Sequence, residues 1–324
     1  MKILVRLPNW LGDMVMSIGF ISALQQTYPG ATISVIAKKG IHTLLEFFPP
    51  IEHQFIFSKD EYPGLSGIWR FGRMIRKKEK FDLFFCLPDS FSSALMGFAA
   101  GAKKRIGHEK ELRSVLLTDV YKKTGMLHRV REYTELLARF ANKIIEPGEI
   151  ALRVNSIEKK NRIIININSE ASSRRLPLQK AVDLILTVHR STASEIVLIG
   201  GKGDISFVET VITQLPDKFP VINLTGKTSL AELVKEIALS RVVLTTDSGP
   251  AHVANALGIY TVVLFGAGNE NNTAPFNKKN RRIIRLGKLP CEPCVKNKCL
   301  LFGIPKCLEL LDDQEIVQSL KLEV

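Results

Sequence analysis

The chain has 324 residues, of which 45% are hydrophobic and 24% are charged. This balance is typical of a globular protein and excludes an intrinsically disordered chain. The length predicts two domains of about 150 residues each. No uncharged apolar run reaches about 18 residues, and the apolar start at Met1 to Arg6 is too short for a signal peptide. We therefore expect a cytoplasmic protein without a membrane-spanning helix.

Lys and Arg number 45 against 32 Asp and Glu, which gives a formal net charge of +13. So strong a positive charge predicts an anionic partner: a nucleic acid, an anionic membrane surface or a phosphorylated substrate. Nucleic acid is the least favoured, because no helix-turn-helix, zinc-finger or aromatic-basic motif accompanies the charge. The excess gathers at residues 70–80, 103–113, 122–123 and 278–282. Solvated helix faces are the simplest interpretation of any single cluster.

Short apolar segments alternate with helical patterns through the first half of the chain. In order, these are a strand at Ile3 to Leu7, a helix from about Met14, a strand at Thr32 to Ala37, a helix near Ile41 to Phe47, a strand at Phe81 to Leu87 and a helix at His128 to Ala141. Strands joined by helices predict a parallel, doubly wound sheet, with its ligand cleft beyond the carboxyl ends of the strands.

Asp13 follows the first strand, in a loop that also contains Asn9, Trp10 and Gly12. An aspartate here either caps the next helix or faces a cleft and removes a proton from an acceptor hydroxyl as a general base. Asn9 and Trp10 are candidates for contact with a sugar, and packing at a domain edge explains Trp10 equally well.

Residues 145–160, with Pro147-Gly148 and a charged end, predict a linker between domains 1–155 and 156–324. After it the alternation restarts. The predicted strands are Ile163 to Ile167, Ile196 to Ile199, Pro220 to Leu224, Val242 to Thr245 and Thr261 to Phe265, and the predicted helices lie near Leu178 to His189, Ser229 to Leu239 and Gly249 to Leu257. We therefore expect two similar α/β domains that face each other across a cleft.

The segment from Thr245 to Gly258 joins a strand end to a helix start. The residues before it are apolar and mostly β-branched, and Asp247 or Ser248 can cap the helix that follows. Free N–H groups and the positive end of the helix dipole favour an anion there, Gly249 lets it approach the backbone, and His252 faces the same opening. The segment predicts a diphosphate site, with an ordinary capped helix as the alternative.

Taken together and in order, these motifs resemble the bacterial lipopolysaccharide heptosyltransferases of glycosyltransferase family 9. The resemblance covers nearly the whole chain, and Asn9 to Ser17 is more similar to the second heptosyltransferase of the inner core than to the first. It rests on Gly12-Asp13 before a helix, Thr225 to Leu233, Asp247 to His252, and Phe265-Gly266 followed by Thr273-Ala274-Pro275. It implies a GT-B fold of two Rossmann-like domains and an inverting, metal-independent transfer of heptose from ADP-heptose.

The resemblance also implies roles for single residues. Asp13 would be the general base in an acceptor-binding domain, 1–155, and the second domain, 156–324, would bind the nucleotide sugar. The donor-binding residues would be Ser169, Arg174, Thr228, Asp247, Ser248, Gly249 and His252, with Asp204 near the ribose.

The sequence departs from the family at Arg174-Arg175-Leu176-Pro177, where Lys-Arg-Trp-Pro is usual. Arg174 keeps the positive charge and can bind a diphosphate through two hydrogen bonds. Leucine in place of tryptophan leaves the identity of the donor open.

Four of the five cysteines form the pattern Cys291-x2-Cys294-x4-Cys299-x7-Cys307, whereas Cys86 lies in an apolar strand. Four thiols so close together predict either a structural zinc site or thiols that are free or partly paired. The spacing is not a clean pair of Cys-x2-Cys knuckles, and the resemblance implies no cofactor for catalysis.

The sequence thus predicts a glycosyltransferase that moves heptose from ADP-heptose to a lipid A-core acceptor. The basic first half would hold it at the cytoplasmic face of the inner membrane as a peripheral protein. Two alternatives remain open: a transferase of the same fold with another nucleotide sugar or glycan, and a membrane-associated nucleotide-binding protein without turnover. A nicotinamide dehydrogenase is disfavoured, because the first turn lacks the Gly-x-Gly-x-x-Gly spacing.

Overall fold

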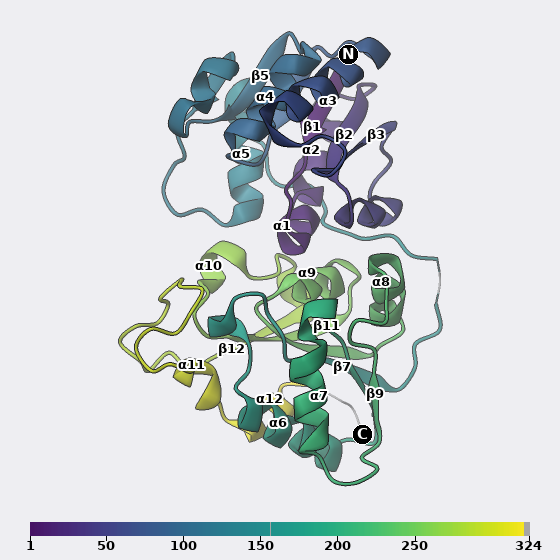
Figure 1. Cartoon of the computed structure of the whole chain (residues 1–324), viewed down its shortest axis with the longest axis vertical. Coiled ribbons are helices and arrows are strands. Elements are labelled where there is room, and N and C mark those ends of the chain that lie inside the picture. Colours follow the sequence, from purple (N-terminus) through teal and green to yellow (C-terminus); the bar gives the residue numbers. More distant parts are fainter. Residues whose placement is uncertain (156, 321–324) are drawn as a thin grey trace. The chain divides into compact units, whose positions relative to one another are not determined.

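The computed structural model describes residues 1–155 and 157–320, which divide into two compact units, Met1–Arg153 and Val154–Val324 (Figure 1). Residue 156, where the second predicted domain begins, lies outside the described residues. Each unit has its own six-stranded sheet. None of the helices in the described part of the chain is long and apolar enough to cross a membrane.

The sheet of the first unit has the strand order β3-β2-β1-β4-β5-β6, and each adjacent pair is parallel. Its strands are β1 (Lys2–Arg6), β2 (Thr32–Lys38), β3 (His53–Phe57), β4 (Leu83–Cys86), β5 (Lys104–His108) and β6 (Asp119–Tyr121). The three predicted strands correspond to β1, β2 and β4. The direction of strand addition reverses between β1 and β4, and such switch points are where open α/β sheets bind ligands.

The helical elements of the first unit are α1 (Leu11–Met16), α2 (Ile18–Thr27), η1 (Ile41–Phe47), α3 (Gly64–Lys78), α4 (Phe91–Ala100), η2 (Glu111–Leu116) and α5 (Arg129–Ala141). Two predictions need correction. The helix expected from Met14 is divided at Ser17, whose hydroxyl donates to the Met14 carbonyl (2.7 Å), and α2 begins at Ile18. The segment Ile41–Phe47 is a 3₁₀ helix.

Helix α3 separates apolar from basic residues. Ile68, Phe71 and Ile75 are buried in a cluster beneath the helix, together with side chains of β3 and β4. Its exposed basic residues are Arg70, Arg73, Arg76, Lys77 and Lys78. The basic cluster predicted at residues 70–80 is therefore mainly a solvent-facing side of one amphipathic helix.

The sheet of the second unit has the order β12-β11-β10-β7-β8-β9, again wholly parallel. Its strands are β7 (Arg162–Asn166), β8 (Glu195–Leu198), β9 (Val221–Asn223), β10 (Val242–Thr246), β11 (Tyr260–Phe265) and β12 (Arg281–Arg285). The first five were predicted; β12 was not. Here the switch point lies between β7 and β10, which places the Thr245 to Gly258 segment at the position expected for a ligand.

The helical elements of the second unit are η3 (Ser172–Arg174), α6 (Leu178–Ser191), η4 (Lys202–Asp204), α7 (Ile205–Thr213), α8 (Leu230–Ala238), α9 (Gly249–Ala256), α10 (Glu270–Thr273), η5 (Lys278–Asn280), α11 (Lys306–Glu309) and α12 (Asp313–Gln318).

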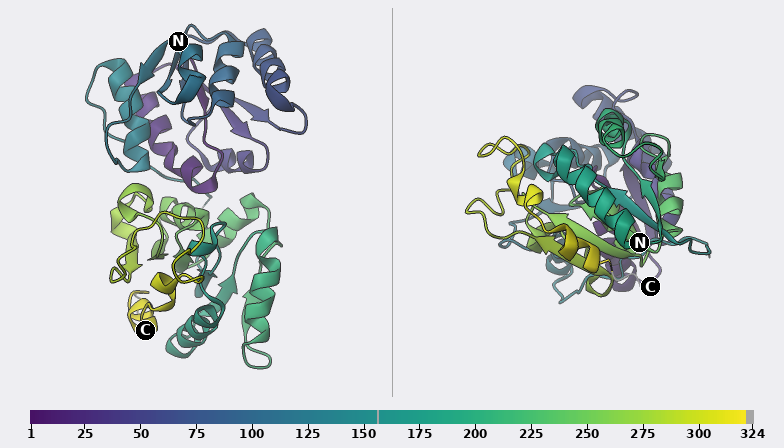
Figure 2. Two further views of the ribbon diagram at one scale, coloured as in Figure 1. Left: turned by 60° about the vertical axis from the view of Figure 1, so that its left-hand side comes forward. Right: turned by 90° about the horizontal axis from the view of Figure 1, so that it is seen from below.

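Helices lie on both faces of this second sheet (Figure 2). Alternate residues of β11 show the two faces: Val262 and Leu264 join the large core that includes α6, α7 and α12. Val263 and Phe265 instead contact Ala251 of α9. This alternation follows from the period of two along a strand.

Candidate active site

Asp13 lies in the first turn of α1, directly after the switch-point strand β1. It does not cap this helix: Trp10 occupies the N-cap position, and no side-chain capping bond forms there. The Asp13 carboxylate instead meets the start of α5. The Tyr133 hydroxyl donates to Oδ1 (3.3 Å), and Nε of Arg129 lies 3.4 Å from the same oxygen. Two residues about 120 positions away thus hold the proposed base.

Burial raises the pKa of Asp13 above its usual value, since a charged carboxylate loses hydration there. Arg129 and the Tyr133 hydrogen bond oppose this shift, whereas the charge of Glu132 adds to it. Burial also raises the pKa of Tyr133 well above its ordinary value, so its hydroxyl remains a hydrogen-bond donor. The result is a carboxylate that is more basic than a solvated aspartate and is held in a fixed orientation.

A chain of alternating charges continues from Arg129 along the carboxyl edge of the first sheet. Arg129 pairs with Glu132 (2.7 Å), and Glu132 pairs with Lys123 (2.7 Å). Lys123 pairs with Asp89 (2.5 Å), which lies 3.5 Å from the fully buried Arg113. Arg129, Glu132 and Tyr133 were not among the predicted site residues. Helical periodicity identified α5, but it gave no sign of which of its residues face Asp13.

Asn9 and Trp10 differ in what surrounds them. The Asn9 side-chain oxygen accepts a hydrogen bond from the buried Arg6 guanidinium (2.5 Å), which orients the loop after β1. The Trp10 side chain is 60% exposed within the described structure. An exposed aromatic ring beside the loop of Asp13 suits stacking on a sugar, and the acceptor-binding role of both residues stays a prediction.

In the second unit, Asp247 joins β10 to α9. It is 4% exposed, and its Oδ2 lies 3.3 Å from Nη1 of Arg174. Burial raises the pKa of Asp247 to about 6, although Arg174 and Arg285 both lower it; Glu270 raises it further. Gly268 lies so close that a Cβ atom there would overlap with Oδ2. The close backbone of Gly268 therefore limits where the Asp247 carboxylate can lie, and the positive charges of Arg174 and Arg285 stabilise its charged form.

Arg285, at the end of β12, fixes the loop that confines Asp247. Its guanidinium donates to the carbonyls of Gly266 (3.1 Å) and Gly268, and it pairs with Glu270 (2.6 Å). Arg285 and Glu270 were not among the predicted site residues. A signal was present in the arginines that flank the apolar pair Ile283-Ile284, a pattern that fits a strand ending in a charged residue.

Ser248 is the N-cap residue of α9, but its side chain makes no capping bond, so this part of the sequence prediction was wrong. Its hydroxyl accepts a hydrogen bond from Asn166 at the end of β7 (2.8 Å) and donates to the Thr246 carbonyl (3.1 Å). The side chains at the ends of β7 and β10 are thus linked. The helix N-terminus is left without a side-chain cap, which favours an external anion.

The other predicted donor-binding residues lie along the same edge of the second sheet. Ser169 follows β7, Gly249 is the first residue of α9, and His252 is buried in that helix. Thr228 lies in the loop between β9 and α8. Their contacts with a donor remain predictions.

Asp204 and Leu176 have contacts inside the protein. Asp204 pairs with Arg175 (2.7 Å) and accepts a hydrogen bond from the Gly201 N–H (2.9 Å). Leu176 is buried in the large core of the second unit. The leucine at the family's tryptophan position therefore packs inside this unit.

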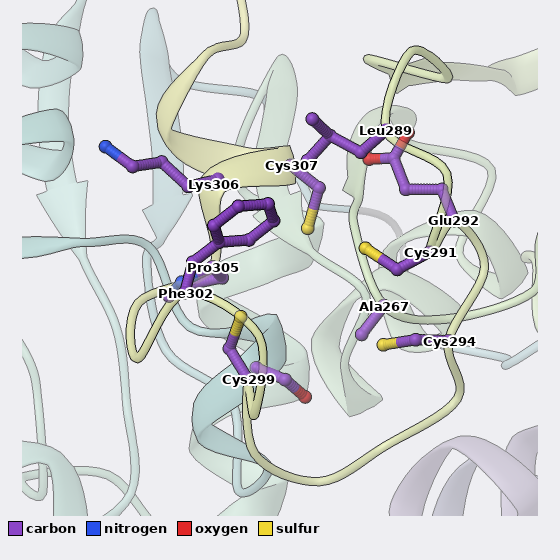
Figure 3. Close-up of a pocket in the computed structure, with 11 residues that line it drawn as sticks. Ala267, Leu289, Cys291, Glu292, Cys294, Cys299, Phe302, Pro305, Lys306 and Cys307 are labelled. Atoms are coloured by element: carbon purple, nitrogen blue, oxygen red, sulfur yellow. The ribbon is translucent and has the colours of Figure 1, made fainter.

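All four clustered cysteines line one small cavity, together with Ala267, Leu289 and Glu292 (Figure 3). Each of them is a free thiol. Burial raises the pKa of Cys307 to about 11, and negative charge at Glu292 adds to this shift. Among the residues that the structure describes, no group of three or more His, Cys, Asp or Glu side chains is placed so that it could hold a metal ion. The four thiols share a cavity without being a preformed ligand set.

The chain is similar to known proteins along almost its full length. The model of glycosyltransferase family 9 (heptosyltransferase) matches residues 68–304. Lipopolysaccharide heptosyltransferase 2 of Escherichia coli is 31% identical over 88% of both chains. Lipooligosaccharide heptosyltransferase 2 of Campylobacter jejuni is 25% identical over 99% of this chain and 98% of its own.

A solved structure of the E. coli ADP-heptose lipopolysaccharide heptosyltransferase II superposes with a TM-score of 0.83 at 27% identity, and the match covers 99% of this chain and 97% of that one. This agreement confirms the α/β, GT-B fold class. The predicted resemblance is likewise confirmed, because sequence and structure lead to the same proteins: the chain is a glycosyltransferase that belongs to family 9, the heptosyltransferases.

Proposed function

We propose that this enzyme transfers heptose from ADP-heptose to a sugar hydroxyl of the lipopolysaccharide inner core, with inversion at the anomeric carbon. The names of its relatives support this reaction, and several of these relatives are second heptosyltransferases. The observation that carries the mechanism is the setting of Asp13, which has a raised pKa and two fixed partners at a switch point.

In the first unit, which we propose to bind the acceptor, Asp13 takes the proton of the attacking hydroxyl. The hydroxyl oxygen forms a bond to the anomeric carbon of the heptose while the bond to ADP breaks. The proton remains on the Asp13 carboxylate. Tyr133 and Arg129 hold that carboxylate in place, so the ordering of the base is complete before the acceptor binds.

In the second unit, which we propose to bind the donor, the diphosphate lies at the N-terminus of α9. Negative charge grows on the diphosphate as the glycosidic bond breaks. The helix dipole and the guanidinium of Arg174 stabilise this charge most in the transition state. The Arg174 side chain is 27% exposed, so its guanidinium can bind phosphate oxygens while it remains paired with Asp247. Asp247 is then available to accept hydrogen bonds from hydroxyls of the donor.

We further propose that the enzyme works as a peripheral protein at the cytoplasmic face of the inner membrane, where a lipid-linked acceptor is presented. Helix α3 supports this proposal, since its exposed basic residues adjoin exposed Leu65 and Trp69, and Trp69 contacts Phe98 of α4. Aromatic and basic side chains on one face suit an anionic bilayer surface.

The reaction is tested by incubating the enzyme with ADP-heptose and a heptose-deficient lipopolysaccharide that carries one inner-core heptose. We expect mass spectrometry to show the gain of one heptose with wild type, and a gain that is about 100- to 10,000-fold slower with Asp13→Asn. The matched control is Asp60→Asn, an exposed residue of the same unit, which should keep full activity. Transfer from another nucleotide sugar alone would refute the assigned donor, and donor binding without any turnover would refute the enzymatic proposal.

A further inference from the structure

The loop that carries three of the clustered cysteines has little to hold it together. Between β12 and α11, residues 286–305 contain neither helix nor strand. Structureless segments of this length are uncommon in compact domains and need another source of order. Apolar packing supplies little of it, because the exposed side chains include Val295, Leu300, Leu301, Phe302 and Ile304.

The four sulfur atoms share one space. Cys291, Cys294 and Cys299 come from this loop, Cys307 comes from α11, and their Sγ atoms point into the same cavity (Figure 3). The cavity has a volume of about 20 Å³, which is room for a single water-sized particle. The loop therefore folds around a space that fits one ion.

One acidic side chain lies beside these sulfurs. Glu292 also lines the cavity, and both of its carboxylate oxygens are buried without a hydrogen-bond partner among the described residues. A buried carboxylate without a partner is costly. Four thiolates around a divalent ion carry a net charge of −2 and would not offset that cost, so the four sulfurs around one cavity, and not Glu292, point to a metal.

We infer that Cys291, Cys294, Cys299 and Cys307 bind one divalent, thiophilic metal ion, Zn²⁺ or Fe²⁺, as four thiolates. Both ions accept four sulfur ligands in a tetrahedral arrangement. The sulfurs are not yet a ligand set, but cysteine side chains move between staggered rotamers, and all four already border the cavity. Binding replaces the four S–H protons, which pass to solvent, with four metal–sulfur bonds.

The metal would also order the donor site that we propose above. The cysteine loop contacts η3 directly: the Asn297 carbonyl accepts from the Ser173 N–H (3.2 Å), and the Lys296 carbonyl accepts from the Ser173 hydroxyl (2.5 Å). Ser173 directly precedes Arg174. The Val295 N–H donates to the carbonyl of Ala267 (2.8 Å), next to the Gly268 that confines Asp247.

The metal is tested with the full chain purified without a metal-affinity step. We expect elemental analysis to find about one zinc or iron per chain, and visible absorption from thiolate-bound iron distinguishes the two. The double variant Cys294→Ala/Cys299→Ala should lose the metal. Cys86→Ala is the matched control, because that cysteine is buried in β4, and it should keep the metal.

A second test needs no variant. A chelator applied to the wild-type protein should lower its melting temperature, and added metal should restore it. Metal-free protein with four alkylatable thiols would overturn the inference, and so would metal-free protein with disulfides among them. The effect of the metal on the donor site rests on the proposed function, and it is tested separately by measuring the affinity for ADP. We expect removal of the metal to weaken ADP binding about tenfold. Unchanged affinity in metal-free protein would refute the link while leaving the metal site in place.

Discussion

Arg174 and Asp247 form an ion pair at the carboxyl edge of the second sheet, with Nη1 3.3 Å from Oδ2. The two residues come from different strand ends, since Arg174 follows β7 and Asp247 follows β10. Because the pair lies beside the N-terminus of α9, it puts a cation where a diphosphate would bind and an acceptor where hydroxyl groups would lie. The switch point therefore presents both kinds of group that a nucleotide sugar needs, a cation for its diphosphate and a hydrogen-bond acceptor for its hydroxyl groups.

Replacing Arg174 with glutamine should weaken ADP binding by about 10- to 100-fold, which is the range expected for the loss of charge-assisted hydrogen bonds. Lysine at the same position should restore part of this affinity, because it keeps the charge but not the planar fork. Calorimetric titration with ADP measures both. Arg175→Gln is the neighbouring control, since Arg175 pairs with Asp204 instead, and equal losses in the two variants would contradict a specific role for Arg174.

The Asp247→Asn variant should be more stable than wild type at pH 7. Burial raises the pKa of Asp247 from an ordinary 3.8 to about 6, so the folded state holds this proton more tightly than the unfolded state does. The contribution of this tighter proton binding to the free energy of unfolding is fully present below pH 3.8 and is lost as the pH rises to about 6. At pH 7 the charged carboxylate therefore costs about 1–3 kcal/mol of stability, which asparagine avoids.

Denaturant unfolding at a series of pH values checks this prediction. The difference in the free energy of unfolding between Asp247→Asn and wild type should grow between pH 4 and pH 7. A variant that is less stable than wild type at pH 7 would show that the pairing with Arg174 outweighs the cost of burial. Donor affinity should fall in the same variant, which would separate the binding role of Asp247 from its effect on stability.

The sequence patterns predicted the strands that flank both switch points, because buried parallel strands such as β1, β7 and β10 are continuous apolar runs. The strand order that makes them switch points was not predicted. They missed β12, whose sequence begins with two arginines and places only Ile284 among its fully buried residues. Edge strands of this kind lack the pattern that identifies a central strand. Fold class could therefore be read from the sequence, whereas the limits of the sheet could not.

The site was predictable only in part, for a similar reason. Asp13 and Asp247 follow strand ends, so their places could be deduced from local patterns. Tyr133, Arg285 and Glu270 act through contacts that span many residues of the chain, and periodicity says nothing of such contacts. The predicted cap at Asp13 failed because Asp13 lies inside the first turn of α1, where its carboxylate faces Tyr133. The Ser248 hydroxyl makes no capping bond and contacts Asn166 instead.

Gly268 should tolerate no side chain, since a Cβ atom would overlap with Oδ2 of Asp247. Gly268→Ala should lower stability by about 1–3 kcal/mol, as overpacking in a close-packed site does, and should weaken ADP binding by displacing Asp247. Gly203→Ala is the matched control, because a Cβ there meets no atom within 4 Å. Thermal unfolding and ADP titration of the two variants test the contrast, and equal behaviour would contradict it.

Attachment to the membrane should depend on α3. Lys77→Gln/Lys78→Gln should weaken binding to vesicles of anionic phospholipid by about 2 kcal/mol, or roughly 30-fold, since each basic residue near such a surface contributes about 1 kcal/mol. The control pair, Lys278→Gln/Lys279→Gln, removes the same charge from an exposed site in the second unit. Cosedimentation with anionic and with zwitterionic vesicles measures the effect. Equal losses in both pairs would indicate an effect of net charge alone.

Activity should fall at acid pH as Asp13 becomes protonated, and the fall should begin at a higher pH than for a solvated aspartate, because burial raises the pKa of Asp13.

The Tyr133→Phe variant tests whether Asp13 is the group that titrates. The Tyr133 hydrogen bond lowers the pKa of Asp13, so its loss should raise that pKa further and move the acid limb of kcat/KM to higher pH. At neutral pH the rate should fall far less than the 100- to 10,000-fold expected for Asp13→Asn. Tyr28→Phe, a change outside this network, should leave the acid limb where it is in wild type. An equal loss of rate at every pH in Tyr133→Phe would contradict this assignment. Tyr133 would then act by positioning the acceptor or by stabilising the fold, and the acid limb of kcat/KM would not report the protonation of Asp13.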